Sequence, residues 1–107
     1  MKIAYQGVAG SYSESCAKKM YQGCETIPCK TFDECFERSS KDSSVKSLIP
    51  ESNKTTGNIG VEYLIFKYRL NIYAEHFFPI NHNLLGIKGS KLSEIKDVYS
   101  HAQALSQ

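Results

Sequence analysis

The stretch KIAYQGVAGSYSE, residues 2–14, decides the fold class of this 107-residue chain. Apolar and polar side chains alternate over residues 2–6, a pattern typical of a strand, and Gly7 ends it. Ser11 and Glu14 then have the spacing of a capping box, in which both side chains bond to backbone amides where a helix begins. The stretch therefore predicts a strand, a turn and a helix.

The same order of elements is repeated in the next 35 residues. Residues 25–29 predict a second strand, and Thr31 and Glu34 form a second capping-box pattern at the start of another helix. Residues 45–49 predict a third strand. Alternating strands and helices favour a parallel sheet with right-handed crossovers, so the predicted class is α/β.

The second half of the chain is less regular. A polar loop, PESNKTTG at 50–57, precedes an apolar segment, 58–68, that we expect to be a helix buried on most of its sides. The long run 71–87 predicts two strands, or one strand crossing between two lobes. Three short elements are expected after it: a helical turn at 92–96, a strand at 97–99 and a helix start after His101.

The charge balance excludes two classes of partner. The chain has 13 basic and 11 acidic residues, and the basic ones are scattered along it. We therefore expect no nucleic-acid partner and no membrane partner. No segment approaches the ~18 apolar residues of a membrane span, and the first residues enter a strand without the apolar core of a signal peptide. We expect a cytoplasmic protein.

The cysteines do not indicate a metal or redox centre. The four of them, Cys16, Cys24, Cys29 and Cys35, lack the spacing of zinc or Cys-x-x-Cys motifs. In the cytoplasm we expect buried free thiols, with a disulfide as the alternative. The sequence also has no Walker loop, no GxGxxG and no Ser-His-Asp arrangement, so neither a metal nor another cofactor is expected.

Three loops are expected at the carboxyl ends of strands, where α/β sheets bind ligands. They are residues 7–13, 50–58 and 100–102. Each is small and polar and leads into a helix start, whose unpaired amides and positive dipole attract an anion. The alternative is that their Ser and Thr side chains only cap helices. Likewise, His101 either faces a cleft or satisfies a local backbone group.

Three stretches resemble, in order and approximate spacing, the first signature stretches of the prephenate dehydratase family. They are YQGVAGSYSE at 5–14, IPESNKTTGNI at 49–59 and YSHAQALSQ at 99–107. The family typically shows a Gly-x-x-Gly-x-Tyr-Ser-Glu turn, a Pro-Ile-Glu-Asn-Ser-x-x-Gly loop and a Ser-His-Pro-Gln-Ala-Leu helix start. The resemblance spans the whole chain.

The resemblance implies a fold and a reaction. The fold is periplasmic-binding-protein-like (type II), with two lobes and a cleft between them. Residues 1–70 would form the first lobe, and residues 71–107 would form the hinge and the start of an incomplete second lobe. The reaction converts prephenate to phenylpyruvate with loss of water and carbon dioxide, on the route to phenylalanine. It needs sites for two carboxylates and a proton donor for the departing hydroxyl.

The family motifs also imply substrate-binding residues. By position these are Ser13, Asn53, Thr55, Thr56, His101, Gln103 and Ala104. The motifs differ from the family pattern at Glu51, Ser52 and Lys54, which stand at the family's Ile, Glu and Ser. Ala102 replaces a proline that would preset the first helical turn. No catalytic residue is assigned, because the family's Thr-Arg-Phe segment and regulatory domain would lie beyond Gln107.

Three hypotheses follow from the sequence. The first is a prephenate dehydratase-like lyase, inactive as this short chain. The second is a non-catalytic module of the same fold that binds small carboxylates. The third is a homo-oligomer, in which unpaired strand edges of an incomplete second lobe pair with another copy.

Overall fold

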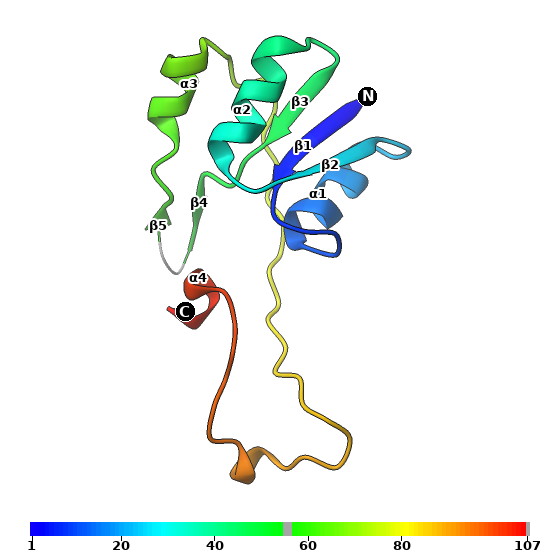
Figure 1. Ribbon diagram of the computed structural model, residues 1–107, viewed down its shortest axis with the longest axis vertical. Coiled ribbons are helices and arrows are strands. Elements are labelled where there is room, and N and C mark those ends of the chain that lie inside the picture. The colour runs from blue at the N-terminus through cyan, green and yellow to red at the C-terminus, as the bar shows by residue number, and fades with distance from the viewer. Residues whose placement is uncertain (55–56, 107) are drawn as a thin grey trace.

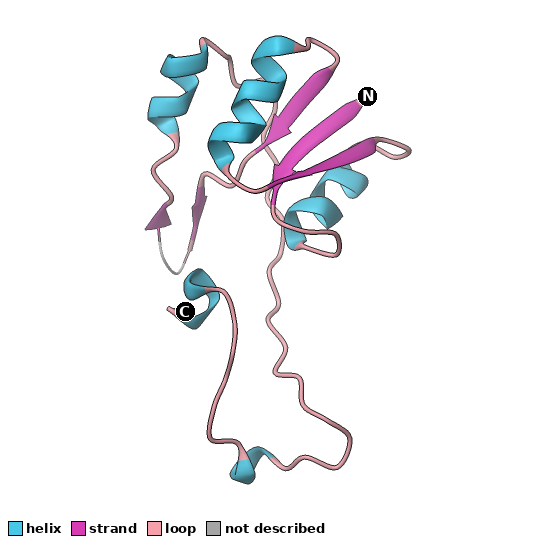
Figure 2. Cartoon of the chain, viewed as in Figure 1, coloured by secondary structure: helices cyan, strands magenta, loops and turns pink. Residues whose placement is uncertain are grey.

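A computed structural model describes residues 1–54 and 57–106, without the side chains of Asn53 and Gln103. The first part of the chain is an α/β unit in which helices pack on a small sheet (Figures 1 and 2). Its elements are β1 (Lys2–Gln6), α1 (Tyr12–Met20), β2 (Glu25–Cys29), α2 (Phe32–Lys41), β3 (Val45–Leu48), β4 (Ser52–Asn53), β5 (Gly57–Asn58) and α3 (Glu62–Tyr68). The α/β class and the first five elements predicted from the sequence are confirmed.

β1 lies in the centre of a three-stranded parallel sheet of order β2-β1-β3. Ala4 of β1 pairs with Ile27 of β2 and with Ser47 of β3. The first crossover leads from β1 to one side, and the second returns across β1 to the other side. Because parallel crossovers are right-handed, α1 and α2 cover opposite faces of the sheet.

The α2 face of the sheet carries the larger part of the core. One buried cluster, Ala4, Cys29, Cys35 and Val45, joins all three strands to α2. A second cluster joins α2 to α3 through Phe36, Val61 and Leu64. The Phe36 ring stacks on Tyr68 at 6.2 Å, and Asp33 of α2 accepts hydrogen bonds from Lys67 and Tyr68, both at 2.7 Å. α3 is therefore fixed to the sheet through α2.

Both capping boxes differ from the expected geometry in the same way. The Ser11 hydroxyl accepts from the Glu14 amide at 3.3 Å, as predicted. The Glu14 carboxylate, however, accepts from the Gly10 amide at 2.7 Å instead of the Ser11 amide. The Ser11 amide donates to the Val8 carbonyl, which makes it unavailable to Glu14. Glu34 likewise accepts from the Lys30 amide, one residue before the Thr31 cap.

The predicted loop 50–57 contains the short antiparallel hairpin β4–β5, in which Ser52 pairs with Asn58. The helix expected over 58–68 begins only at Glu62. Gly60 has a φ of +78°, outside the helical region, and its amide donates to the Asn58 side chain at 2.6 Å. This local turn delays the helix.

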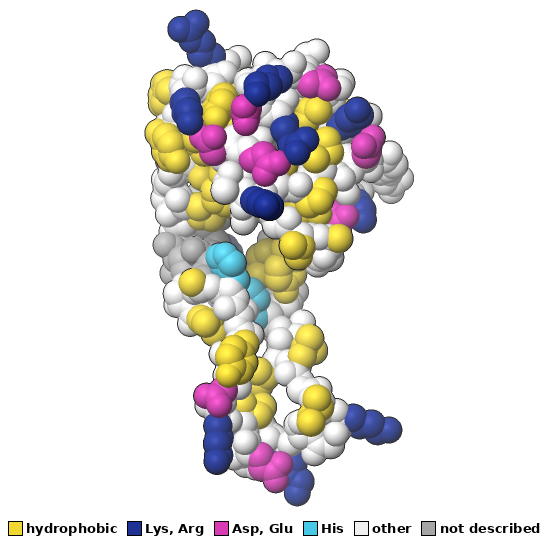
Figure 3. All heavy atoms as spheres, in the orientation of Figure 1, with side chains coloured by type: hydrophobic (Ala, Val, Ile, Leu, Met, Phe, Trp, Pro, Cys, Tyr) yellow, Lys and Arg dark blue, Asp and Glu magenta, His cyan; other side chains and the backbone are white. Residues whose placement is uncertain are grey.

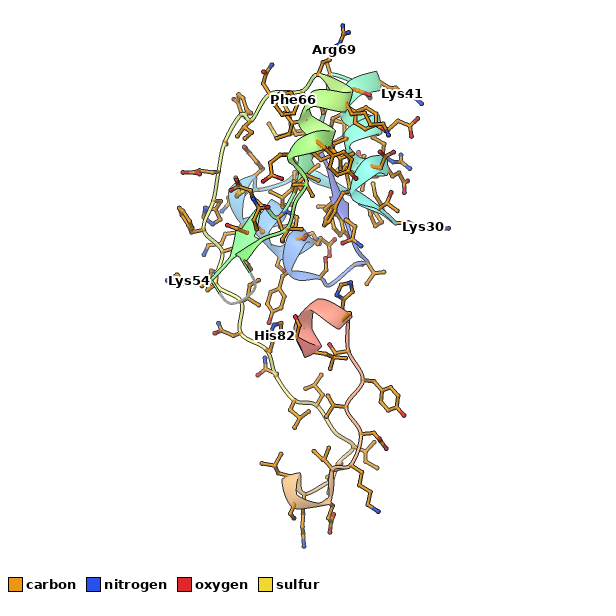
Figure 4. The ribbon with its side chains drawn as sticks, turned by 90° about the vertical axis from the view of Figure 1, so that its left-hand side faces the viewer. Lys30, Lys41, Lys54, Phe66, Arg69 and His82 are labelled. Carbon is orange, nitrogen blue, oxygen red and sulfur yellow. The ribbon has the colours of Figure 1, made fainter. Side chains whose placement is uncertain are left out.

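α3 is less buried than its composition predicts. Leu64 is 1% exposed and faces α2, whereas Tyr63 and Phe66 are 65% and 82% exposed. The expectation of a helix buried on most sides is wrong for this part of the chain, because only one face of α3 has a partner among the described residues. Phe66 lies on the outer side of the helix (Figure 4).

The prediction of strands at 71–87 and 97–99 is wrong, because residues 71–101 contain no strand. A strand forms only where another strand pairs with it. The described regular elements after Tyr68 are a 3₁₀ turn, η1 (Leu92–Glu94), and α4 (Ala102–Leu105). The segment passes along the sheet and extends away as an open loop before returning to α4 (Figure 1). The chain accordingly exposes 8376 Å², whereas a compact chain of this mass exposes about 6,000 Å².

Tyr12 of α1 attaches this segment to the α/β unit. Its hydroxyl donates a hydrogen bond to the Asn81 carbonyl. Its ring makes edge-to-face contacts with Phe78 and His82, at centroid distances of 6.5 and 5.9 Å. Lys19 lies over the Phe78 ring at 5.7 Å. These contacts hold the residues around Asn81 beside the start of α1.

The four cysteines are free, as predicted, and three of them are buried. Among the described helices, none has the length and apolar character needed to cross a membrane.

We predict that Phe36→Ala lowers the free energy of unfolding by about 3–5 kcal/mol, because it empties the cluster that holds α3. The matched control is Phe66→Ala on the exposed side of α3, with an expected change within about 0.5 kcal/mol. Denaturant unfolding of both variants measures the difference. Equal losses would show that α3 is not packed as described.

A second stability prediction concerns Arg69, the residue that ends α3 with a left-handed φ of +52°. Its neighbour Leu70 donates to the Ile65 carbonyl at 3.1 Å, as in a Schellman motif, where glycine is usual. The Arg69 side chain points away from the molecule (Figure 4), so little contact is lost on its removal.

We expect Arg69→Gly to stabilise the chain by about 0.5–1 kcal/mol, after the greater chain entropy of glycine is subtracted from the relieved strain. Arg69→Ala keeps the strain and serves as the control in the same denaturant titration. A loss of stability in Arg69→Gly would contradict the left-handed assignment.

Candidate active site

The sheet topology selects one part of the carboxyl edge. The connection after β1 leads to α1 on one face, and the connection after β3 leads to the hairpin and α3 on the other side. Ligands of open α/β sheets bind where such connections diverge. The candidate site therefore lies between residues 7–13 and residues 49–58.

The β1–α1 loop is tightly folded. Gly7 has a φ of +131°, and a Cβ built on it would lie 3.4 Å from the Ser11 hydroxyl, so glycine suits this position. The Gly7 amide donates to the Cys29 carbonyl at 3.0 Å. Ser13 is half-buried in the first turn of α1. The amides of Tyr12 and Ser13 lie in that turn, where the helix offers them no acceptor.

Glu14 anchors this loop from within. It is 8% exposed, and its carboxylate accepts from the Gly10 amide at 2.7 Å and from the Thr26 hydroxyl at 3.0 Å. Lys18 forms an ion pair with it at 2.9 Å. The Gly10 amide, and then Lys18 and Thr26, lower the pKa of Glu14 to about 2. The carboxylate is therefore charged at neutral pH and joins α1, the loop and β2.

The hairpin carries the second set of candidate residues. Asn53 is in β4, and its side chain lies outside the described part, as do Thr55 and Thr56 entirely. The Ile59 amide closes the hairpin base by donating to the Glu51 carbonyl at 2.8 Å. Lys54, one of the departures from the family pattern, is exposed and extends away from the sheet (Figure 4).

The third set lies at the start of α4. The His101 carbonyl accepts from the amides of Ala104 and Leu105, at 2.9 and 3.1 Å, so His101 precedes the helix as its cap. The His101 side chain is exposed, Ala104 is half-buried, and the Gln103 side chain is not described. α4 lies beneath the carboxyl edge of the sheet in both Figure 1 and Figure 4. The described members of the three sets therefore lie on the same side of the sheet.

The surface around the site has mixed charge. Basic and acidic side chains are interspersed over the α/β unit on the face seen in Figure 3, and histidines lie at the narrow waist below it. Within residues 1–54 and 57–106, no three His, Cys, Asp or Glu side chains are grouped to hold a metal.

An open depression of about 620 Å³ lies at the same edge, on the β2 side of β1. Its lining is Gln6, Gly7, Val8, Pro28, Cys29, Lys30 and Glu34. It shares Gly7 and Val8 with the candidate site, but opens toward the β2–α2 connection. The topology instead favours the other side of β1, toward β3, as the candidate site.

Two contacts of this region were not foreseen from the sequence. The bond from Thr26 to Glu14 joins residues 12 apart, and the bond from Tyr12 to Asn81 joins residues 69 apart. The local capping pattern marked Glu14 as a cap residue, but nothing in it indicated a partner in β2. No sequence signal pointed to the Tyr12 contact.

The chain also has known relatives. A family model described as prephenate dehydratase matches residues 3–107. Over its full length the chain is 41% identical to "Arogenate dehydratase/prephenate dehydratase 1, chloroplastic" of Arabidopsis thaliana and 42% identical to "Arogenate dehydratase 2" of Petunia hybrida. This α/β chain therefore belongs to the prephenate dehydratase family.

The chain spans about a quarter of the length of these curated relatives, 28% and 27% respectively. No solved structure matches it significantly. Several relatives carry the word chloroplastic in their names, and the cytoplasmic location expected for this chain stays a prediction.

The low pKa of Glu14 predicts an acid-sensitive part of the stability. A carboxyl whose folded pKa is about 2, against an ordinary 4.5, stabilises the fold fully above pH 4.5. That contribution is lost as the pH falls from 4.5 toward 2. In Glu14→Gln we therefore expect a smaller loss of unfolding free energy over this range than in the unchanged chain.

The control for this measurement is Glu37→Gln, which removes a glutamate that is paired with Lys41 in the same i, i+4 arrangement but is exposed. Other carboxyls with lowered pKa values remain in both variants, so some acid sensitivity persists; they are Asp33, Glu34, Asp42 and Glu62. An identical pH dependence in Glu14→Gln and Glu37→Gln would contradict the assignment.

Proposed function

We propose that this chain binds prephenate or arogenate as part of a dehydratase reaction, which removes water and carbon dioxide from the substrate. The observation that carries the proposal is the juxtaposition of motifs. The three stretches that resemble the family lie on one side of the sheet, and two of them flank the divergence of connections after β1 and β3. The names of the relatives support the choice of substrate.

The proposed site holds carboxylates. The first turn of α1 offers the amides of Tyr12 and Ser13 and the Ser13 hydroxyl to one carboxylate. Asn53, Thr55 and Thr56, which the second motif implies, would also contact the substrate. His101, Gln103 and Ala104, at the start of α4, would bind the second carboxylate.

The proposed fold of the family is type II periplasmic-binding-protein-like, with residues 1–70 as the first lobe and 71–107 as the hinge and start of the second. Two features support this division. All described strands lie between Lys2 and Asn58. The ring contacts described above between α1 and the later segment come from two residues of α1, Tyr12 and Lys19. Few contacts join the two parts, as expected of a hinge.

Prephenate and arogenate share both carboxylates and the departing ring hydroxyl, and differ in a keto oxygen against an ammonium group. The amides and hydroxyls proposed here recognise the shared groups. Aromatisation drives the loss of carbon dioxide, so the protein needs chiefly to fix the carboxylates and to supply a proton to the leaving hydroxyl.

Calorimetry with prephenate and with arogenate, combined with a phenylpyruvate assay on prephenate, tests the proposal. We expect saturable binding by the 107-residue chain, with turnover at least about tenfold below that of the Arabidopsis relative. Ser13→Ala should weaken binding by about tenfold, the usual cost of losing a hydrogen bond to a charged group. The matched control is Ser15→Ala, which alters an exposed serine on the same helix.

Three outcomes decide between the hypotheses. Binding of neither prephenate nor arogenate would contradict the proposed function. Binding of other small carboxylates as tightly as prephenate, without product, would favour a carboxylate-binding module of the same fold. Equal effects of Ser13→Ala and Ser15→Ala would show that the α1 start is not where the carboxylate binds.

A further inference from the structure

We propose that Glu14 is a positioning residue for substrate binding, whose buried carboxylate holds the β1–α1 loop so that the Tyr12 and Ser13 amides face the carboxyl edge. This inference rests on the proposed function, because it assumes that the start of α1 binds a substrate carboxylate. It assigns no contact between Glu14 and the substrate.

The contacts of Glu14 show how it holds the loop. One carboxylate oxygen accepts from the Gly10 amide at 2.7 Å, which fixes the residue that immediately precedes the Ser11 cap. The other accepts from the Thr26 hydroxyl at 3.0 Å and pairs with Lys18 at 2.9 Å. Because Thr26 belongs to β2, Glu14 attaches the loop to the sheet as well as to its own helix.

Tyr5 supports the same loop from below. Its side chain is fully buried, and its ring edge is 3.9 Å from where a Gly7 Cβ would lie. Its hydroxyl has no hydrogen-bond partner among the described residues. Burial, and secondarily the charge of Glu14, raise the pKa of Tyr5, so the phenol stays neutral beside the carboxylate. The loop therefore rests on a ring at Gly7 and on a carboxylate at Gly10.

The arrangement also decides which amides remain for a ligand. The Ser11 amide is used by the Val8 carbonyl, and the Gly10 amide is used by Glu14. The amides of Tyr12 and Ser13 are left in the first turn, pointing out of the helix start. Lys18 balances the charge of Glu14, which reduces its repulsion of an incoming carboxylate.

Glu34 provides an internal comparison, because it occupies the same cap position in α2. It accepts from the Lys30 amide at 2.9 Å and pairs with Arg38 at 2.8 Å. Its side chain is 32% exposed, against 11% for that of Glu14. The partners named here for Glu34 lie within four residues of it along the chain, whereas Thr26 is 12 residues from Glu14. Both glutamates therefore contribute to capping a helix. Glu14 differs in its additional hydrogen bond to a strand of the sheet.

The test compares Glu14→Gln, Glu14→Asp and the matched control Glu34→Gln. A glutamine keeps the length but replaces one acceptor oxygen with a donor, which cannot face Gly10 or Lys18 favourably. An aspartate keeps the charge but is one methylene too short to reach Gly10 and Thr26 together. We expect both Glu14 variants to bind prephenate at least about tenfold more weakly, as small misplacements of binding groups do. Glu34→Gln should bind as the unchanged chain does.

A second readout separates positioning from a loss of folding. The backbone amide resonances of Tyr12 and Ser13 should shift in both Glu14 variants and stay in place in Glu34→Gln, while the resonances of β3 stay unchanged in all three. If Glu14→Gln does not fold, Thr26→Val removes one of the partners from outside the loop and should produce the same shifts with a smaller loss of affinity.

The failures of the two proposals can be told apart. If the unchanged chain binds neither prephenate nor arogenate, the proposed function is wrong, and the positioning claim then depends on the amide resonances alone. Positioning is overturned if the Tyr12 and Ser13 resonances do not move. It is also overturned if Glu14→Asp restores full affinity, since charge would then matter and geometry would not.

Discussion

The pairing of β1 with a strand on each of its sides is the constraint on which the rest of the structure depends. Because β2 and β3 both run parallel to it, the three carboxyl ends meet at one edge. Because the chain places β2 on one side and β3 on the other, the connections after β1 and β3 must diverge. The β1–α1 loop and the β4–β5 hairpin therefore flank an open edge, whatever their own sequences.

Two N-terminal glutamates convert this arrangement into defined loops. In α1 and in α2, the third helical residue reaches back past the cap to the amide of the residue before it, Gly10 or Lys30. The bond fixes how the chain enters each helix from its strand. In α1 the glutamate is buried and also bonds to β2, so the entry angle of α1 is tied to the sheet. Local capping and long-range packing thus meet in one side chain.

The sequence predicted those parts of the fold whose signals are local. Strand alternation and capping spacing placed β1, α1, β2, α2 and β3 within about two residues of their bounds. The predictions were wrong for elements whose structure depends on pairing or packing with another element. Residues 71–87 and 97–99 have the apolar character of strands, yet among the described residues they form no strand and pair with none. α3 has apolar residues on several sides, but only the side facing α2 is covered.

The candidate site shows the same contrast between local features, which the sequence predicts, and long-range contacts, which it does not. Those residues inferred from the motifs that the structure describes belong to segments at the carboxyl edge of the sheet, and their role in binding stays a prediction. The tie from Glu14 to Thr26 could not be inferred, because it depends on how α1 lies against β2. We propose that the substrate binds at the edge between β1 and β3, and not in the depression beside β2.

Mapping of backbone amide shifts during a prephenate titration tests this claim most directly. We expect the largest saturable shifts at residues 8–14, 51–54 and 101–104, with little change at Cys29 and Lys30 in the depression. Largest shifts at Cys29 and Lys30, or at Gly23 and Asp42 on the opposite edge of the sheet, would contradict it.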